Sequence, residues 1–435
     1  MASRIVIIGG GAGGLELATA LGRRRRWRRK QGVEVVLVDR NPTHLWKPLL
    51  HEVATGAMDS SVDEVSYRAL ARQHGFQFVI GEFSGLDRGR KRITLSPIHD
   101  ERGKAVLPER QISYDRLVLG IGSITNDFNT PGVAEHCLFL DSPQQAQHFQ
   151  KRFLNLLMRT DNERARQLAS RVSITIVGGG ATGVELSAEL MAAVNTVRDY
   201  GFPSLSREAL QVTLLEAGPR LLPALPERLS QSTRRELEAL GIEVRLESPV
   251  TEARPGALIT KDGRRLESDM MVWAAGVRGP DILAELGLSV TRNQQIRVHE
   301  TMQALDDPAI YALGDCAACP QGEDGHLVPP RAQSAHQMAS QMLHNLRLDL
   351  AGKPLRPFRY VDHGSLVTLS HYSAVGTLMG SLSSGSLRVE GRIARLVYVS
   401  LYRMHQIAIY GWMRGLLIAF TDRLHRAFRP RLKLH

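Results

Sequence analysis

Two glycine-rich turns are the segments of this chain best suited to bind a phosphorylated ligand. In a G-x-G-x-x-G turn the first glycine permits a tight bend, the second lets backbone approach a pyrophosphate, and the third lets a helix pack closely on a strand. The first turn holds Gly9, Gly11 and Gly14, and the second holds Gly178, Gly180 and Gly183. The helix that should follow each turn would offer unpaired N–H groups and a positive dipole end to phosphates.

An acidic residue ends the next apolar stretch after each turn: Asp39 after 35–38, and Glu216 after 212–215. A carboxylate there accepts hydrogen bonds from a ribose diol and repels a 2′-phosphate. Glu216 therefore favours NADH over NADPH at the second turn.

The elements that must position these residues occur twice in the same order. Each turn follows a short β-branched strand, 4–8 or 173–177, and precedes a helical stretch. Each copy then closes alike, because 115–122 aligns with 269–276 and ends on Gly122 or Gly276. A strand, turn, helix and acidic strand, repeated, predicts an α/β fold with two Rossmann-like dinucleotide-binding domains.

Two dinucleotide sites in one chain indicate hydride transfer between two cofactors. The stretch 309–315 reads as a strand that ends in Gly314-Asp315. It resembles the second flavin motif of two-dinucleotide-binding flavoproteins, in which the aspartate holds the ribityl chain. A strand ending in an ordinary turn is the alternative. The resemblance implies FAD in the N-terminal copy and the nicotinamide in the inserted copy.

Two further segments make the resemblance more specific: 44–56, which reads H-L-W-K-P-L-L-H-E-V-A-T-G, and 330–337, which reads P-R-A-Q-S-A-H-Q. With the duplicated fold and the ending 429–435, they resemble bacterial type II NADH dehydrogenase along the whole chain. The resemblance implies that FAD takes a hydride from NADH and that a membrane quinone takes the electrons, without proton pumping. It also implies a peripheral enzyme on the cytoplasmic face of the inner membrane, with a homodimer left open.

The resemblance assigns roles to individual residues. It places Ala332, Gln333, Ala335 and Gln337 on the quinone side, where two amides one helical turn apart share a face and can donate to quinone oxygens. It places Glu185 beside the nicotinamide, and Lys47, Pro48 and His51 in the flavin-side loop, where a lysine would stabilise the reduced ring. A polar helix start is the alternative for the two glutamines, and a favourable helix-dipole contact is a second interpretation of Glu185.

The repeat and the resemblance together predict three units. The FAD-binding domain is expected to be discontinuous, from 1–165 and 296–365, and the NADH-binding domain to span 166–295. Residues 366–435 are expected to form a C-terminal region that associates with the membrane.

Three cysteines, Cys137, Cys316 and Cys319, are too few for a disulfide scaffold and suit a reducing compartment. The pair Cys316 and Cys319 makes a C-x-x-C, which raises a redox dithiol as an alternative. Disulfide reductases of this superfamily carry their pair elsewhere, so we expect none here. We also expect no metal, because no second C-x-x-C or close histidine pair completes four ligands.

In the C-terminal stretch, apolar residues recur at the three- and four-residue spacing of one helix face. Its apolar residues are Ile409, Trp412, Met413, Leu416, Leu417, Phe420, Leu424 and Phe428, and five basic residues follow, Arg423, Arg426, Arg429, Arg431 and Lys433. Arg414 interrupts the apolar run, so this helix is expected to lie on an anionic bilayer. Packing on the protein's own core is the alternative. We expect neither a spanning helix nor a cleaved leader.

The formal net charge of +11 indicates an acidic partner surface, either lipid or nucleic acid. The densest basic run is 23–30, and Trp27 within it hints at a membrane interface. Two other functions stay open. One is a soluble NADH-dependent reductase of a small carrier protein, which would not need the C-terminal helix. The other is an NADH-sensing flavoprotein that binds nucleic acid, for which the chain shows no nucleic-acid motif.

Overall fold

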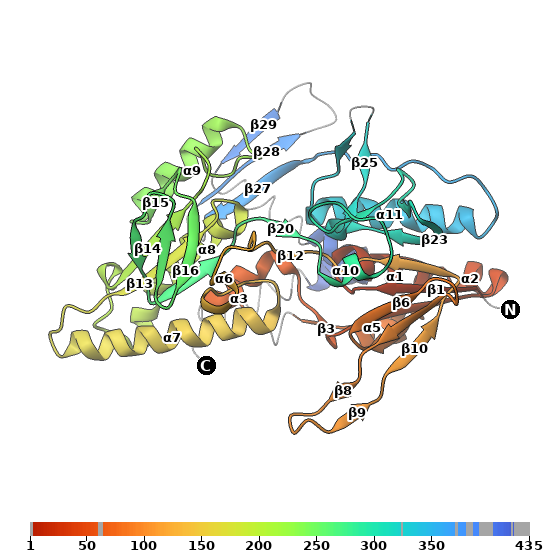
Figure 1. The fold of residues 1–435 in the computed structure, drawn as a ribbon, viewed down its shortest axis with the longest axis horizontal. Coiled ribbons are helices and arrows are strands. Elements are labelled where there is room, and N and C mark those ends of the chain that lie inside the picture. The colour runs from red at the N-terminus through yellow and green to blue at the C-terminus, as the bar shows by residue number, and fades with distance from the viewer. Residues whose placement is uncertain are drawn as a thin grey trace.

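The computed structural model describes residues 3–59, 64–322, 325–369, 373–379, 386–390, 403–418 and 421. Two lobes lie side by side, each built on its own sheet, and the short strands β12 and β20 connect them (Figure 1). The predicted repeat is present. The first sheet has the strand order β22-β23-β11-β1-β2-β5, and the second has the order β15-β14-β13-β19.

The strands of the first sheet are β1 (Ser3–Ile8), β2 (Val33–Asp39), β5 (Gln77–Ile80), β11 (Arg116–Leu119), β22 (Gln303–Ala304) and β23 (Asp307–Ala312). The second sheet holds β13 (Val172–Val177), β14 (Leu210–Leu215), β15 (Glu243–Arg245) and β19 (Met270–Trp273). All their pairings are parallel except β22 with β23. Helices cover such sheets on both faces, which explains why these strands are almost continuously apolar.

The two copies agree down to single hydrogen bonds. Asp115 accepts one from the backbone N–H of Arg4 at 2.6 Å, and Asp269 accepts one from Ser173 at 2.9 Å. Each aspartate therefore anchors the third strand of its copy beside the first. The alignment of 115–122 with 269–276 is confirmed, because β11 pairs with β1 as β19 pairs with β13.

The principal helices of the first lobe are α1 (Ala12–Arg23), α2 (Arg25–Gln31), α5 (Tyr67–His74) and α11 (Ala332–Asp349). Those of the second are α7 (Pro143–Ala165), α8 (Ala181–Val197) and α9 (Glu227–Ala239). Ser142 caps α7 through the N–H of Gln145, and Pro143 fits its first turn. The buried side chains of α7 pack in the second core, although the flavin-side unit was predicted to extend to residue 165.

Shorter elements fill the space around the two sheets. Near the first sheet are β3 (Thr43–His44), η1 (Lys47–Leu49), α3 (Leu50–Thr55), β4 (Val65–Ser66), β6 (Phe83–Asp87), β7 (Arg92–Leu95), β8 (Ile98–His99), β9 (Ala105–Leu107) and β10 (Arg110–Ser113). Between and beyond the sheets are β12 (Ile124–Thr125), α6 (Val133–His136), η2 (Arg198–Tyr200), η3 (Arg207–Ala209), β16 (Val250–Arg254), β17 (Ala257–Thr260), β18 (Arg265–Glu267) and β20 (Val277–Arg278). The rest are α10 (Ile282–Glu285), β21 (Ile296–Arg297), η4 (Gly314–Cys316), β24 (Ala317–Ala318), β25 (Pro320–Gln321) and β26 (His326–Leu327).

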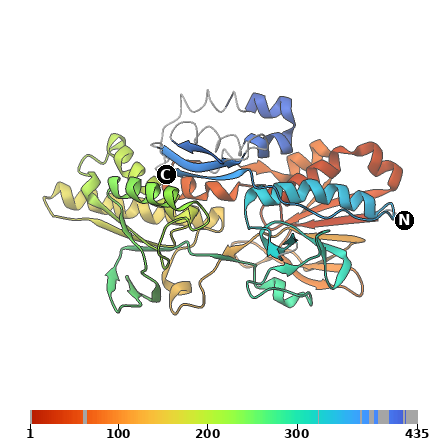
Figure 2. The same ribbon diagram turned by 90° about the horizontal axis from the view of Figure 1, so that it is seen from above.

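A three-stranded antiparallel sheet opens the C-terminal region, and sequence analysis did not anticipate it. Its strands are β27 (Gly364–Leu369), β28 (Ser373–Met379) and β29 (Ser386–Glu390). Residues of β27 lie against α8, and residues of β28 lie near α9. The C-terminal region is therefore joined to the second lobe as well as to the first (Figure 2).

The C-terminal helix differs from the single helix predicted from Ile409 onward. Helical residues 403–410 and 412–418 are separated at Gly411, whose φ is +87°; we call them together the 403–418 segment. Gly411 is left-handed, and such a glycine commonly ends a helix. Ile409 is buried in the first core while Trp412 is 67% exposed, so the predicted apolar face divides at this bend. Phe420, Leu424, Phe428 and the five basic residues lie outside the described part.

Trp27 does not support the predicted membrane contact. It packs against the first core, and the guanidinium of Arg347 lies 5.7 Å from its ring centroid. Its basic neighbours form the separate short helix α2, none of whose residues is buried. Within the described residues, no helix combines the length and the apolar character that crossing a bilayer requires.

Candidate functional site

The glycines of each turn have the three separate roles that the pattern predicts. Gly9 and Gly178 bend the chain at φ +96° and +113°. A Cβ on Gly14 would lie 2.0 Å from the carbonyl oxygen of Gly9, and one on Gly183 would lie 2.0 Å from that of Gly178. These contacts leave no room for a side chain where helix and strand meet.

The middle glycines face open space. A Cβ added to Gly11 or to Gly180 would meet no heavy atom within 4 Å. Both residues directly precede their helices, α1 and α8. Each turn therefore leaves a bare backbone surface beside a helix N-terminus, and this surface fits a dinucleotide pyrophosphate.

The acidic residues at the two strand ends, Asp39 and Glu216, are hydrogen-bonded to their glycine turns. Asp39 accepts a hydrogen bond from the N–H of Gly10 at 2.6 Å, and Glu216 accepts one from Gly179 at the same distance. Burial raises the pKa of Asp39, although backbone N–H groups that point at it act in the other direction. The second oxygen of Glu216 accepts from the N–H of Gly218 at 2.7 Å. The carboxylates therefore lie at the turn edge, where a ribose would meet them.

Asp315, Ser123 and Lys47 meet at the other end of the first site. Ser123 donates its hydroxyl proton to Asp315 at 2.8 Å, and Lys47 donates from Nζ to the Ser123 carbonyl oxygen at 2.8 Å. Gly122, which precedes Ser123, has φ +73° and open space at its Cβ position. Asp315 and Ser123 line a cavity of about 200 Å³. The structure thus brings Lys47 and Asp315, which are far apart in sequence, to one place.

Ser123 and Asp141 complete this cluster, and sequence analysis missed both. Asp141 accepts from Lys47 at 3.1 Å and from the N–H of Thr125 at 3.0 Å. Ser123 directly follows the aligned Gly122, but the second copy has Val277 at that position, so the repeat does not mark the serine. Nothing in the pattern marks Asp141.

The predicted nicotinamide-side and flavin-side residues also meet. The Nδ1 atom of His51, on α3, lies 3.7 Å from a carboxylate oxygen of Glu185, on α8. Both side chains are buried. Burial lowers the pKa of His51 to about 4, so the ring is neutral at pH 7. Pro48 lies in η1, immediately before α3. The flavin-side loop therefore reaches across to the second lobe.

Gly276 occupies the place in the second copy that Gly122 occupies in the first, with φ +67°. Unlike at Gly122, the space beside it is filled, because a Cβ there would lie 2.7 Å from the ring of Phe128.

Ala332, Gln333 and Gln337 lie in the first two turns of α11. The side-chain amide of Gln337 makes two hydrogen bonds to the backbone of Val361. It accepts from the N–H at 3.0 Å and donates to the carbonyl oxygen at 2.8 Å. Gln333 makes longer bonds, 3.5 Å to the carbonyl oxygen of Val361 and 3.3 Å from the hydroxyl of Tyr360. The two glutamines thus share a helix face, as expected, and both contact the chain at 360–361.

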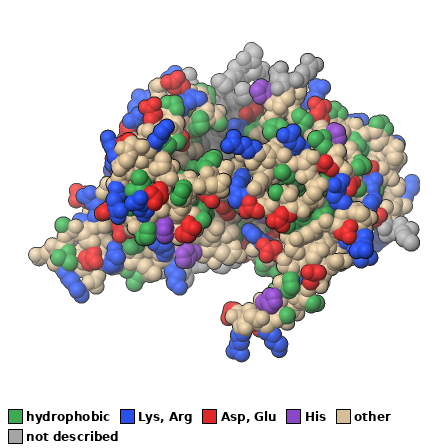
Figure 3. Space-filling model, viewed as in Figure 1, with side chains coloured by type: hydrophobic (Ala, Val, Ile, Leu, Met, Phe, Trp, Pro, Cys, Tyr) green, Lys and Arg blue, Asp and Glu red, His purple; other side chains and the backbone are tan. Residues whose placement is uncertain are grey.

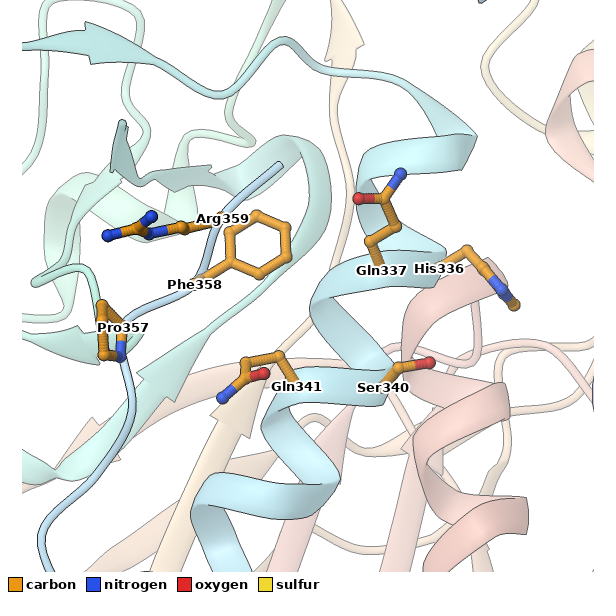
Figure 4. Close-up of a pocket in the computed structure, with 7 residues that line it drawn as sticks. All are labelled: His336, Gln337, Ser340, Gln341, Pro357, Phe358 and Arg359. Atoms are coloured by element: carbon orange, nitrogen blue, oxygen red, sulfur yellow. The ribbon is translucent and has the colours of Figure 1, made fainter. Parts of the chain in front are cut away.

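A cavity of about 420 Å³ lies between α11 and the chain at 357–359. In Figure 4, Gln341 extends toward the side of Pro357 and Phe358, while His336 points away from them. Gln337 also lines this cavity. Its lining is largely polar.

The two C-x-x-C thiols lack the exposure and the lowered pKa that are typical of a redox pair. Cys316 and Cys319 are both buried and free, and Cys316 donates to the carbonyl oxygens of Leu119 and Leu313. Burial raises the pKa of Cys316 to about 11 and that of Cys319 to about 12. Since the thiolate is the reactive form, both thiols are inert at neutral pH.

The fold and its two glycine turns define a two-dinucleotide-binding flavoprotein. Comparison with known proteins agrees: residues 3–339 match the pyridine nucleotide-disulphide oxidoreductase family. The chain is 48% identical to a type II NADH:quinone oxidoreductase of Haemophilus influenzae, over 99% of each chain. It is 28% identical to a type II NADH:quinone oxidoreductase of Mycobacterium tuberculosis, over 93% of this chain and 84% of that one.

Solved structures show the same fold. The structure of NDH2 from Plasmodium falciparum in complex with NADH covers all of both chains with a TM-score of 0.81 at 18% identity. The sulfide:quinone oxidoreductase of Aquifex aeolicus covers 94% of this chain and 92% of that one, with a TM-score of 0.70 at 18% identity. The chain belongs to the type II NADH:quinone oxidoreductase family.

The two glycines of the second turn give a matched pair of variants. Gly183→Ala should destabilise the protein by roughly 1–3 kcal/mol, because the new methyl group overlaps a backbone oxygen. Gly180→Ala should unfold at the wild-type temperature and weaken NADH about tenfold, because its methyl group takes pyrophosphate space. Thermal unfolding and NADH titration measure the two effects. Equal stability losses in both variants would contradict the assignment of the open surface.

Glu216→Arg should weaken NADH by ~1.5–3 kcal/mol, because the ribose loses a charged acceptor, and should admit NADPH through the guanidinium. Glu267→Arg, at a side chain that is 80% exposed, is the control. Steady-state KM values for the two nucleotides measure the change. An unaltered KM for NADH would remove Glu216 from the ribose site.

Proposed function

We propose that this chain oxidises NADH through bound FAD and reduces a membrane quinone to quinol, without moving protons across the bilayer. The observation that carries this function is the 48% identity to a type II NADH:quinone oxidoreductase along 99% of both chains. The two open glycine turns support it, because they supply one site for each dinucleotide. Anaerobic mixing with NADH and then a soluble quinone analogue, followed by flavin absorbance, tests it. A protein that stays colourless when supplied with FAD would refute it.

The residues of the first turn would hold FAD. Its pyrophosphate would lie on the bare backbone at Gly11, its ribose at Asp39, and its ribityl chain at Asp315. When bound, the flavin supplies the hydride and electron chemistry. Lys47 contributes a cation between Ser123 and Asp141, and such a cation stabilises negative charge that develops nearby.

The residues of the second turn would hold NADH. Gly180 would face its pyrophosphate and Glu216 its adenosine ribose. Glu185, near the start of α8 and 3.7 Å from His51 of the flavin-side loop, is placed to border the nicotinamide where the two lobes meet.

The quinone is assigned to the N-terminal end of α11. Among the described residues, Gln333 makes two long hydrogen bonds, of 3.3 and 3.5 Å, so its amide can turn toward a quinone oxygen at small cost. Gln337 is committed to the backbone of Val361 and would fix the wall of the site. This differs from the equal roles that their spacing predicts.

The 403–418 segment supports attachment to a lipid surface. Five large apolar side chains on it are exposed: Met404 at 46%, and Trp412, Met413, Leu416 and Leu417 at 67, 69, 57 and 62%. Grouped exposed apolar residues mark an interaction site. A membrane would cover them and bring the enzyme to its lipid-dissolved substrate, and the cytoplasmic face is the side where NADH is produced.

The other two functions receive less support. A soluble reductase of a small carrier has no use for this exposed apolar group. A nucleic-acid-binding flavoprotein would need a concentrated basic surface, and on the face in Figure 3 acidic side chains lie among the basic ones.

Gln333→Ala should reduce quinone turnover by about tenfold while leaving flavin reduction by NADH within twofold, because only the second half-reaction uses the amide. Gln231→Ala, at an exposed position of α9 in the second lobe, is the control. Stopped-flow absorbance separates the two half-reactions. Equal loss in both would contradict the assignment of Gln333 to the quinone.

Leu416→Glu with Leu417→Glu should abolish pelleting with anionic vesicles, because two charges replace apolar surface. NADH oxidation with a water-soluble quinone analogue should continue, since the substitutions lie on an exposed surface. Vesicle cosedimentation measures the binding. Undiminished pelleting would move the lipid contact elsewhere.

A further inference from the structure

Four ionisable side chains, three of them buried, form a continuous series of contacts outside the two glycine turns. Glu16 of α1 accepts from Nδ1 of His336 at 2.5 Å and from Nδ1 of His405 at 2.6 Å, one carboxylate oxygen for each histidine. The Nε2 atom of His405 lies 2.9 Å from that of His44. Glu16, His405 and His44 are each at most 6% exposed.

These four residues come from four segments that are distant in sequence. Glu16 belongs to the helix of the first glycine turn, His44 to the strand that precedes the flavin-side loop, and His336 to α11. His405 belongs to the 403–418 segment, and its ring stacks on Trp46 with centroids 6.1 Å apart. One carboxylate thus joins the flavin, quinone and lipid sides of the proposed function.

The internal repeat gives Glu16 a counterpart. Glu16 is the second residue after Gly14, as Glu185 is the second residue after Gly183. Both glutamates are buried, and each contacts a histidine of another unit, His405 or His51. In both copies the same helix position therefore carries a contact between units.

A second contact on α1 holds the same segment. Arg23 lies two turns after Glu16 on one helix face, and its guanidinium donates to the carbonyl oxygen of Ile409. Ile409 is 1% exposed and belongs to the first core. His405 and Ile409 are themselves one turn apart, so α1 fixes the first half of the segment at two points.

His336, the member of the four on α11, lies within the quinone motif. His336 lies between Gln333 and Gln337 and is the partly exposed member of the four, at 38% of its side chain. Its bond to Glu16 fixes the rotation of the first turns of α11 on α1. That rotation determines where the amide of Gln333 can point.

We infer that Glu16 is a positioning residue for the quinone half-reaction, because its buried carboxylate fixes both α11 and the 403–418 segment against the flavin helix. The inference rests on the proposed function. Glu16 would hold the lipid-facing segment and the quinone-facing amide in a fixed position relative to each other.

The protonation states give this contact a pH dependence. Burial by itself would raise the pKa of Glu16, but the hydrogen bonds from His336 and His405 outweigh it and leave that pKa below its usual value. The bond to Glu16 raises the pKa of His336 against desolvation. Burial lowers the pKa of His44 to about 3, so that ring is neutral. Tyr67 lies near His44 and is itself near Asp39, and Arg23 and His74 lie further along the α1 contact.

Glu16 and His336 stabilise the folded state over different pH ranges. The lowered pKa of Glu16 gives stabilisation that is present above its ordinary value of 4.5 and lost as the pH falls through the folded value. The raised pKa of His336 gives stabilisation that is complete below its ordinary value of 6.5 and lost as the pH rises through the folded value. The contact is therefore strongest between these two ordinary values and weakens at alkaline pH.

Glu16→Gln in the full-length FAD-loaded protein tests the inference, because it removes the charge and keeps the shape. We expect a roughly five- to tenfold rise in KM for a quinone analogue, with flavin reduction by NADH within twofold. The alkaline rise of that KM should also disappear. Glu267→Gln, at an exposed side chain, is the control and should match the wild type.

Hydrogen exchange gives a readout that is independent of turnover. Amides of 403–418 and of the first turns of α11 should exchange faster in Glu16→Gln, and those of α8 should not. His405→Phe should reproduce the faster exchange of 403–418, whereas His405→Asn, which keeps a donor near Nδ1, should restore it. Combined with Glu16→Gln, His405→Phe should add little, because both remove one contact.

Two outcomes distinguish a failure of the inference from a failure of the proposed function. If Glu16→Gln lowers the unfolding temperature but leaves the quinone KM, its pH profile and the exchange of 403–418 unchanged, Glu16 is only structural and the inference is wrong. If the wild type reduces no quinone, the proposed function fails. The exchange experiment would then still decide whether Glu16 holds the segment.

Discussion

The contact between the third glycine and the first glycine of each turn is the constraint on which the rest of the structure depends. A Cβ at Gly14 or Gly183 would lie 2.0 Å from a backbone oxygen, so only glycine lets the helix begin directly at the end of the strand. That approach brings the helix N-terminus, the bare backbone and the acidic end of the next strand to one sheet edge. Under the proposed function, both pyrophosphates would be bound through main-chain groups of the turns, which leaves the side chains of α1 and α8 available for other contacts.

Those side chains connect units that the two sheets alone would leave separate. The segment from Trp46 to Met58 lies in sequence between β2 and β5 of the first sheet but packs its apolar side chains in the second core. Lys47 in this segment bonds to Ser123 at the flavin end, and His51 faces Glu185 of the second lobe. Hydride transfer needs the two cofactors within contact distance. A segment that belongs to the first lobe in sequence and packs in the second core therefore adds to the restraint that the short strands β12 and β20 place on the two lobes.

Local patterns determined how much of this could be predicted from the sequence. The glycine turns, the two parallel sheets and the aligned aspartates Asp115 and Asp269 depend on contacts that recur at fixed spacing, and the structure confirms them. The break at Gly411 was missed because periodicity records which residues are apolar and not which helix face each one joins. Ser123, Asp141 and the Glu16 chain depend on pairs 16 to 389 residues apart in sequence, which no local pattern specifies. The sheet β27–β29 was not predicted because its strands pair with one another outside the two repeated units.

The repeat also explains why one helix position could acquire two related tasks. Duplication of the turn would have produced two glutamates, each two residues after a packing glycine and each turned inward near the start of a helix. A buried carboxylate is costly unless hydrogen-bond donors meet it, so every such position requires a partner from another segment. In the first copy His336 and His405 meet the carboxylate at hydrogen-bond distance, and in the second copy His51 of the flavin-side loop lies 3.7 Å from it. The fold therefore carries a ready contact point at each dinucleotide site. Two segments that lie outside the two sheets, the flavin-side loop and the 403–418 segment, both contact the protein at these points.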